Sequence, residues 1–123
     1  MLGQCDLIGF VATADAVRAK TFYVDVLGLE FVSDDGFALV VRANGLMVRV
    51  VKMAGATPVP YTVLGWEVPD VEKMVKELAG VGVEFVRYPY FVQDELGIWT
   101  APSGSRVAWF KDPDGNVLSL SQH

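Results

Sequence analysis

The 123-residue sequence contains one cysteine and one histidine, and nowhere are two lysine or arginine residues adjacent. The single cysteine, Cys5, excludes a disulfide within the chain and suits a reducing compartment, so we expect a cytoplasmic protein. Nucleic-acid binding needs a basic stripe, so the scattered basic residues and the net charge of −5 argue against that partner. No apolar run approaches the ~20 residues of a membrane span, which argues against a membrane protein.

Apolar residues, by contrast, are abundant and make up 52% of the chain. A single domain of this length buries roughly two thirds of the surface that its unfolded chain exposes. The remaining apolar surface is therefore expected to line a cavity or a subunit interface.

Two segments of the chain, residues 8–31 and 63–85, share one layout. Each runs from an apolar strand through Asp, a helix, Gly and an apolar residue to Glu and Phe. Asp15 and Asp70 stand where helix N-caps accept hydrogen bonds from the N–H groups of the first turn. The repeat therefore predicts two copies of one structural module.

Antiparallel strands are predicted after each helix. Asn44-Gly45 is a strong hairpin signal between residues 37–43 and 46–53, and Asp112-Pro113-Asp114-Gly115 is a second turn before the last strand. Both halves are thus predicted to run β-α-β-β-β. We expect one domain over residues 1–123, with module one at about 5–53 and module two at about 61–122.

Alternation along these strands predicts which side chains share a face. Across the first hairpin Val40 is expected opposite Arg49, and across the last hairpin Ala108 is expected opposite Ser119. This second register would place Trp109 on the helix-covered face, where Trp66 is also expected. The opposite, mixed faces are predicted to hold Arg42, Arg49, Glu67, Arg106 and Ser119.

The segments "TADAVRAKTFYVDVLGLEF" and "WFKDPDGNVLSL" resemble the vicinal oxygen chelate superfamily, which includes glyoxalase I, extradiol dioxygenases and bleomycin resistance proteins. The resemblance covers almost the whole chain, with both repeats in the right order. It implies an α+β fold in which two βαβββ modules form an open eight-stranded half-barrel. It also implies that two copies of the chain pair as a homodimer.

Metalloenzymes of this superfamily hold a divalent ion on the inner face of the half-barrel, with one ligand from each of four strands. The resemblance places those four positions at Ile8, Arg49, Val63 and Ser119. Isoleucine and valine cannot donate to a metal, and arginine repels a cation, so we expect no metal and no cofactor. The only histidine, His123, is expected to be a frayed end rather than a ligand.

Two hypotheses for Arg49 stay open at this stage. Its guanidinium could donate hydrogen bonds to an anionic or carbonyl group of a ligand, or it could form an internal ion pair with Glu67. Glu67 could alternatively be a general base whose pKa is raised by burial, although no partner acid is visible. Arg42 and Arg106 lie nearer strand ends and are expected to be solvated rim charges.

The stretch "FVRYPYFVQDELGIWT", residues 85–100, is the most aromatic part of the chain. Its rings could form a stacking wall for a planar or cationic ligand, or they could form the seam of a dimer. Both interpretations place aromatic side chains on an exposed surface.

The leading hypothesis is a homodimeric small-molecule-binding protein that holds an unidentified organic ligand in the concave face without a metal. The alternatives are a lyase or dioxygenase with an unconventional metal site, and an assembly module whose cavity is filled by side chains. No catalytic residue is predicted. The expected ligand-binding residues are Ile8, Phe10, Arg42, Arg49, Val63, Glu67, Tyr90, Trp99, Phe110 and Ser119.

Overall fold

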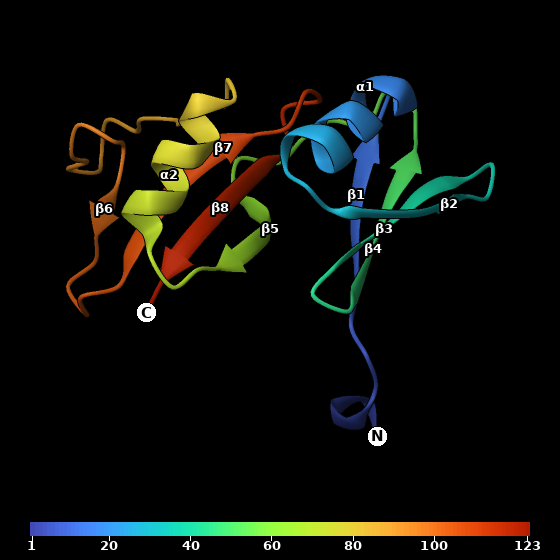
Figure 1. The fold of residues 1–123 in the computed structure, drawn as a ribbon, viewed down its shortest axis with the longest axis horizontal. Coiled ribbons are helices and arrows are strands. Elements are labelled where there is room, and N and C mark those ends of the chain that lie inside the picture. Colours follow the sequence, from blue (N-terminus) through green and yellow to red (C-terminus); the bar gives the residue numbers. More distant parts are fainter. The chain divides into compact units, whose positions relative to one another are not determined.

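The computed structural model describes all 123 residues, which form two compact units, Met1–Thr57 and Pro58–His123. Each unit contains one four-stranded sheet and its own helix (Figure 1). The predicted α+β class, with two successive βαβββ modules, is confirmed. None of the helices combines the length and the apolar character that crossing a bilayer demands.

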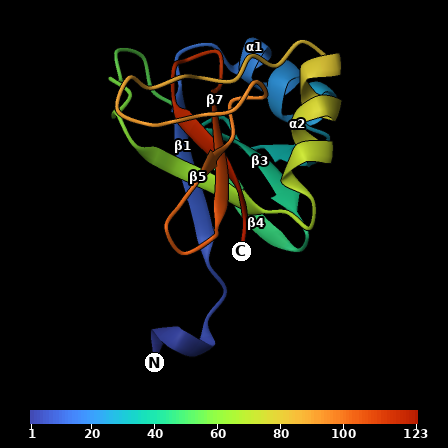
Figure 2. The ribbon, with the colours of Figure 1, turned by 90° about the vertical axis from the view of Figure 1, so that its left-hand side faces the viewer.

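The first unit has the strand order β1-β4-β3-β2, with β1 parallel to β4 and the other pairs antiparallel. As predicted, the Asp15 carboxylate caps the helix by accepting from the Arg18 N–H at 3.1 Å. The short η1 lies away from the sheet at the end of an extended segment (Figures 1 and 2). The elements are η1 Leu2–Gln4, β1 Ile8–Thr13, α1 Ala16–Lys20, the π-helical η2 Thr21–Val26, β2 Glu30–Asp34, β3 Ala38–Ala43 and β4 Leu46–Lys52.

The β3–β4 hairpin has the predicted register, with Val40 opposite Arg49. Asn44 and Gly45 both have positive φ, 47° and 83°, as a two-residue turn of the type favoured in hairpins requires. The alternate residues of the two strands on the helix side are buried against α1 and η2: Leu39, Val41, Val48 and Val50. Phe37 has the same alternation as these residues, but it precedes β3 and is 79% exposed.

The second unit repeats this plan with the strand order β5-β8-β7-β6, and β5 is parallel to β8. The Asp70 carboxylate caps α2 by accepting from the Lys73 N–H at 3.1 Å. Val71 and Val75 are the buried residues of α2, which packs against β7 and β8. The elements are β5 Thr62–Glu67, α2 Val71–Gly80, β6 Trp99–Thr100, β7 Arg106–Lys111 and β8 Val117–Gln122.

The predicted register of the last hairpin is wrong by one residue, because Ser119 lies opposite Trp109 and not Ala108. The loop contains five residues between the paired Lys111 and Val117. Gly115 has a φ of 89° and donates to the Asp112 carbonyl at 3.0 Å, so a tight turn ends in a left-handed glycine. That arrangement inserts a bulged residue and shifts every later pair by one.

The Asp112 side chain holds this bulged loop together. Its Oδ1 accepts from the N–H groups of Asp114 and Asn116 at 3.0 and 2.9 Å, and its Oδ2 accepts from Asn116 Nδ2 at 2.8 Å. Both Asp112 and Asn116 are buried, so their polar groups have found partners within the turn.

The shifted register changes which residues face α2. The helix-covered face of the second sheet holds Ala108, Phe110, Leu118 and Leu120, all almost fully buried. Trp66 stacks on Phe110 with ring centroids 6.3 Å apart, which confirms its place on the helix-covered face, where it is half-buried. Trp109, which was predicted beside it, projects from the opposite, open face.

Candidate functional site

The open face of the first sheet centres on Arg49 of β4. This residue lies between Phe10 of β1 and Val40 of β3 in the sheet register. Phe10 is 58% exposed, and Ile8, two residues earlier in β1, is also exposed. Arg42, two residues beyond Val40 in β3, shares this face, which therefore combines apolar side chains with two guanidiniums, as the sequence predicted.

The partner of Arg49 is Asp35, in the turn between β2 and β3. Arg49 Nη2 donates to Asp35 Oδ2 at 2.7 Å, while Asp35 Oδ1 accepts from the N–H groups of Phe37 and Ala38 at 2.9 Å each. These contacts, led by the Arg49 hydrogen bond, lower the pKa of Asp35 from 3.8 to about 2. The guanidinium is thereby oriented by a carboxylate within its own unit.

The sequence left open an ion pair between Arg49 and Glu67, and each of these residues has a partner within its own unit, Asp35 in the case of Arg49. Glu67 instead binds His123, whose backbone N–H donates to Glu67 Oε2 at 2.9 Å and whose Nδ1 contacts Glu67 Oε1. These bonds to His123 lower the pKa of Glu67, so the predicted rise through burial is wrong. His123 is held by two contacts and is not frayed.

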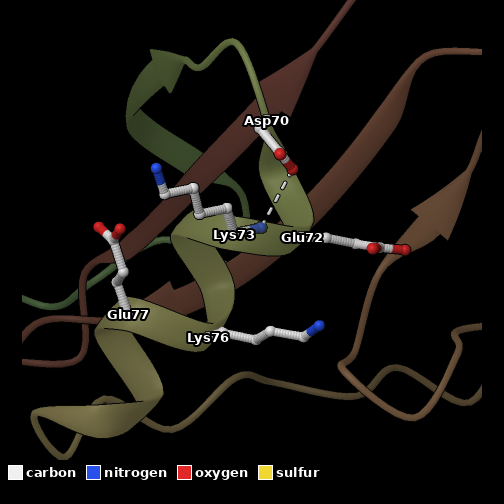
Figure 3. A pocket seen from close by; sticks show the side chains of 5 residues that line it. All are labelled: Asp70, Glu72, Lys73, Lys76 and Glu77. Carbon is white, nitrogen blue, oxygen red and sulfur yellow. Dashed lines mark hydrogen bonds between the residues drawn. The ribbon is translucent and has the colours of Figure 1, made fainter.

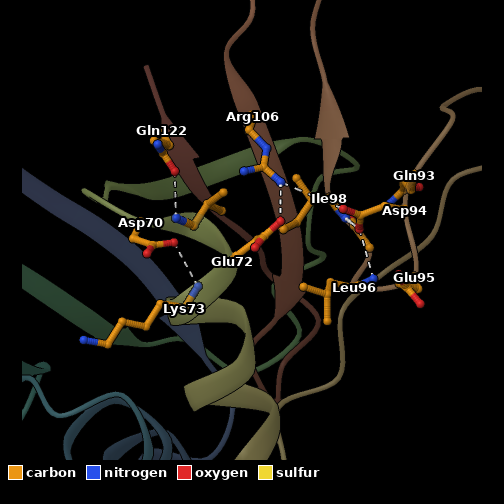
Figure 4. A network of polar contacts seen from close by, with 12 residues as sticks. Asp70, Glu72, Lys73, Gln93, Asp94, Glu95, Leu96, Ile98, Arg106 and Gln122 are labelled. Carbon is orange, nitrogen blue, oxygen red and sulfur yellow. Dashed lines mark hydrogen bonds and ion pairs between the residues drawn. The ribbon is translucent and has the colours of Figure 1, made fainter.

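Two further basic residues have structural partners near strand ends. Arg42 lies 3.8 Å from Glu30, as expected for a rim charge. Arg106 was expected on the mixed face, but it shares the helix side with Ala108. It pairs with Glu72 of α2 at 3.1 Å and lies 4.0 Å from Asp94, so it connects the helix to the following loop (Figure 4).

The open face of the second sheet has a small-residue floor beside Trp109. Ser119 lies opposite Trp109 and next to Gly65 of β5, and it is only 6% exposed. A Cβ on Gly65 would come within 3.0 Å of Ser119 Oγ, so this floor has no room for a larger residue without movement. Val63 falls at a shift in the β5–β8 register and is exposed.

Five aromatic side chains gather on this face, and we call them the ring cluster: Tyr88, Tyr90, Phe91, Trp99 and Trp109. Phe91 stacks on Trp109 with ring centroids 5.0 Å apart and planes 4° apart, and its centroid is 4.5 Å from that of Trp99. Tyr88 meets the Trp109 ring edge-on at 5.4 Å. Burial, with the nearby Tyr90, raises the pKa of Tyr88. The cluster is thus a continuous aromatic surface.

A hydrogen-bonded loop, residues 86–98, carries three of these rings. The Gln93 side chain accepts from the Tyr88 N–H at 2.7 Å and donates to the carbonyls of Val86 and Gly97 at 2.9 and 2.8 Å. Arg87 Nη2 donates to the carbonyls of Asp94 and Glu95 at 2.7 and 3.0 Å. The side chains of Gln93 and Arg87 therefore fix both ends of this loop, which contains no helix.

A pocket of about 620 Å³ lies beside the ring cluster. Tyr90 and Trp99 contribute its aromatic wall, and the exposed Val92 contributes an apolar rim. Asp94, Thr100 and the Gln93 side chain add polar groups. This combination of apolar walls and few polar groups is typical of sites for small organic molecules.

Two other pockets, of about 500 Å³ each, lie along α2 and are lined mainly by charged side chains. Among the residues of the first, the one hydrogen bond joins the Asp70 carboxylate to the Lys73 N–H, which is the helix cap (Figure 3). Glu72, Lys76 and Glu77 project from the exposed side of the helix. We interpret this surface as the solvated face of an amphipathic helix.

The residues at the four family metal positions do not fit a divalent ion. Ile8 and Val63 carry no donor atom, and the Arg49 guanidinium is a cation already bonded to Asp35. Ser119 offers one hydroxyl. No group of three or more His, Cys, Asp or Glu side chains is arranged to hold a metal elsewhere in the structure.

Phe110 was expected to contact a ligand, but it is 1% exposed and faces α2. Asp35 and Gln93, which position Arg49 and the aromatic loop, were not predicted from the sequence. Asp35 precedes Gly36 in an Asp-Asp-Gly turn, a pattern that indicates a side-chain-capped turn. Nothing in the sequence around Gln93 distinguishes its amide from that of a surface glutamine.

A model of the Glyoxalase/Bleomycin resistance protein/Dioxygenase superfamily matches residues 4–120. No curated protein matches the sequence.

Several solved structures are similar to this chain. Lactoylglutathione lyase from Agrobacterium tumefaciens is 18% identical, with a TM-score of 0.74 over 97% of this chain and 93% of the other. The bleomycin resistance determinant encoded on transposon Tn5 is 20% identical, with a TM-score of 0.75 over 96% and 97%. TnmS3, an antibiotic binding protein from Streptomyces sp. CB03234, is 24% identical, with a TM-score of 0.68 over 95% and 93%.

At these identities, the structural similarity establishes the fold and not the ligand. The family model covers nearly the whole chain, and both βαβββ modules lie within the matched residues. The chain therefore belongs to the Glyoxalase/Bleomycin resistance protein/Dioxygenase superfamily.

Proposed function

We propose that this protein binds a small organic molecule on an open sheet face and does so without a metal ion. The observation that carries the proposal is the ring cluster beside a pocket of about 620 Å³. Aromatic rings left partly exposed on a sheet face offer a ligand a large contact area with little loss of side-chain freedom.

The proposed contacts on the second sheet are Tyr90 and Trp99, with Val63 and Ser119 nearby. On the first sheet they are Ile8, Phe10 and Arg49, whose guanidinium Asp35 holds in place. Arg42 and Glu67 contribute charge at the rim. Phe110 is removed from this set because it has no surface that a ligand could reach.

Two relatives support this proposal by what they bind or confer. One is a bleomycin resistance determinant, and another is an antibiotic binding protein. A binding role is also consistent with the residues at the expected metal positions, because the Ser119 hydroxyl is the one group among them that could coordinate a metal ion. A second copy of the chain is the proposed partner, because family members of this length pair, and we place the protein in the cytoplasm.

Calorimetric titration of bleomycin and of a panel of ring-bearing organic molecules tests the proposal. The titrations use wild type, Arg49→Ala and Trp99→Ala in a buffer containing EDTA. We expect saturable binding to wild type and at least tenfold weaker binding to Trp99→Ala. Heats that never saturate with wild type, or equal affinities in all three proteins, would contradict the proposed site.

The competing function is a lyase or dioxygenase, as the A. tumefaciens relative illustrates for the family. Elemental analysis of protein purified without chelators separates the two functions. A stoichiometric content of Ni, Zn, Fe or Mn would support the enzyme, whereas the binding proposal expects substoichiometric metal.

A further inference from the structure

The ring of Phe91 stacks on Trp109 and lies tilted by 35° against Trp99. It is parallel to Trp109 within 4°, and its centroid is 5.0 Å from that of Trp109 and 4.5 Å from that of Trp99. These separations are at the short end of the range for stacked aromatic pairs. The contact is therefore a full stacking arrangement between a loop residue and the sheet.

The two tryptophans form a platform that belongs to the sheet itself. Trp99 pairs with Val107 across β6 and β7, so Trp99 and Trp109 are diagonal neighbours on the same face. Their centroids are 6.1 Å apart, with the planes inclined by 33°. Ser119, opposite Trp109, is too small to cover either ring.

Phe91, in contrast, reaches this platform from a segment with few bonds of its own. Gln93 and Arg87 fix the chain before and after residues 89–92. Within that segment one backbone hydrogen bond is present, from the Phe91 N–H to the Tyr88 carbonyl at 3.1 Å. Tyr90 and Val92 on either side of Phe91 are 71% and 91% exposed. Stacking, more than backbone bonding, holds the Phe91 ring.

We propose that the Trp99–Trp109 platform is a stacking site for a flat aromatic ring of an organic ligand, and that Phe91 fills it in the free protein. The ligand's ring replaces the Phe91 ring, which swings out on the sparsely bonded segment. This inference rests on the proposed function and specifies the class of ligand. A saturated ring or a chain cannot restore the stacking that is lost and binds more weakly.

Removing the Phe91 side chain is expected to strengthen ligand binding, although Phe91 touches the site. If Phe91 were a wall of the site, its removal would weaken binding. If Phe91 is a resident ring, Phe91→Ala opens the platform, and a flat ligand no longer competes with it. The expected gain is about threefold to tenfold, the factor that one aromatic stacking pair supplies.

The experiment titrates wild type, Phe91→Ala and Phe91→Leu with two flat probes of opposite charge, 9-aminoacridine and naphthalene-2-sulfonate, and with non-aromatic cyclohexylamine. Probe binding is followed by quenching of tryptophan fluorescence and by calorimetry. Both variants are expected to bind both flat probes more tightly than wild type. Val81→Ala, at an exposed valine outside both the ring cluster and the pocket, is the control and should bind like wild type. Adding Trp109→Leu to Phe91→Ala should abolish the gain.

A second measurement checks the exchange in the wild type. Phe91 ring protons stacked on Trp109 should have upfield NMR shifts, and saturation with 9-aminoacridine should return them to ordinary values. Equal or weaker binding by Phe91→Ala, with far-UV circular dichroism unchanged, would overturn the proposal that Phe91 occupies the platform in the free protein. If wild type binds while Phe91→Ala binds less well, the proposed function stands and only the exchange is refuted. If no variant binds a flat probe, the stacking site is refuted.

Discussion

Arg49 and Asp35 form an ion pair of 2.7 Å that links the middle of β4 to the turn between β2 and β3. The same carboxylate accepts two backbone N–H groups of that turn. Asp35 therefore has two roles at once: it closes a turn, and it orients the Arg49 guanidinium on the open face of the first sheet.

This pair predicts a specific loss of stability in acid. The folded-state pKa of Asp35 is about 2, below the ordinary 3.8, so folding favours the charged carboxylate. Its stabilising contribution is complete above the ordinary pKa and is lost as the pH falls from 3.8 through about 2. Urea unfolding of wild type and Asp35→Asn across pH 2–6 should show a smaller acid slope for Asp35→Asn. Identical slopes would contradict the assignment.

Glu67 should titrate below its ordinary value for a different reason. Its two hydrogen bonds to His123 favour the charged form, so the Glu67 contribution to stability is lost as the pH falls below the ordinary pKa of 4.5. Carbon-13 NMR of the carboxyl group should report the lowered pKa in wild type. In a chain that ends at Gln122, the pKa should return toward 4.5, whereas an unchanged titration would exclude His123 as the cause.

The close approach of Gly65 to Ser119 predicts a pair of coupled substitutions. Gly65→Ala places a Cβ within 3.0 Å of Ser119 Oγ and should lower the free energy of unfolding by about 1 kcal/mol through overpacking. Adding Ser119→Ala removes the obstructing hydroxyl and should recover most of that loss. A double-mutant cycle from urea unfolding measures the coupling, and strictly additive effects would show that the contact is loose.

Gln93 should be the residue on which the aromatic loop depends most. Gln93→Leu removes three hydrogen bonds and leaves two carbonyls and one N–H without their partner, which should cost about 2 kcal/mol of unfolding free energy. Near-UV circular dichroism should weaken as Phe91 leaves the tryptophans. Val92→Ala serves as the control in the same loop, and a near-UV spectrum unaffected by Gln93→Leu would contradict the scaffold role.

The sequence was most informative where local chemistry determines geometry. Asn44-Gly45 admits one common hairpin turn, so the Val40–Arg49 pairing followed from counting. The Asp112–Gly115 turn also predicted a hairpin, but the turn motif did not indicate the bulge that Gly115 permits or the register that results from it. That single residue moved Trp109 from the expected core to the open face.

Partners that lie far apart in the sequence were the least predictable. The Arg49–Asp35 pair spans 14 positions and the Glu67–His123 pair spans 56, and no periodicity indicates either one. The aromatic composition of residues 85–100 was visible, but the stacking of Phe91 on Trp109 depends on the corrected register.

We propose that an open sheet face binds a ring-bearing organic molecule without a metal. A tryptophan-fluorescence titration of wild type and Trp109→Leu with 9-aminoacridine, in EDTA and again after addition of Zn²⁺ or Mn²⁺, tests this binding directly. Wild type should bind saturably with the same affinity in both conditions, and Trp109→Leu should bind at least tenfold more weakly. Binding that appears only with added metal, or that does not need Trp109, would contradict it.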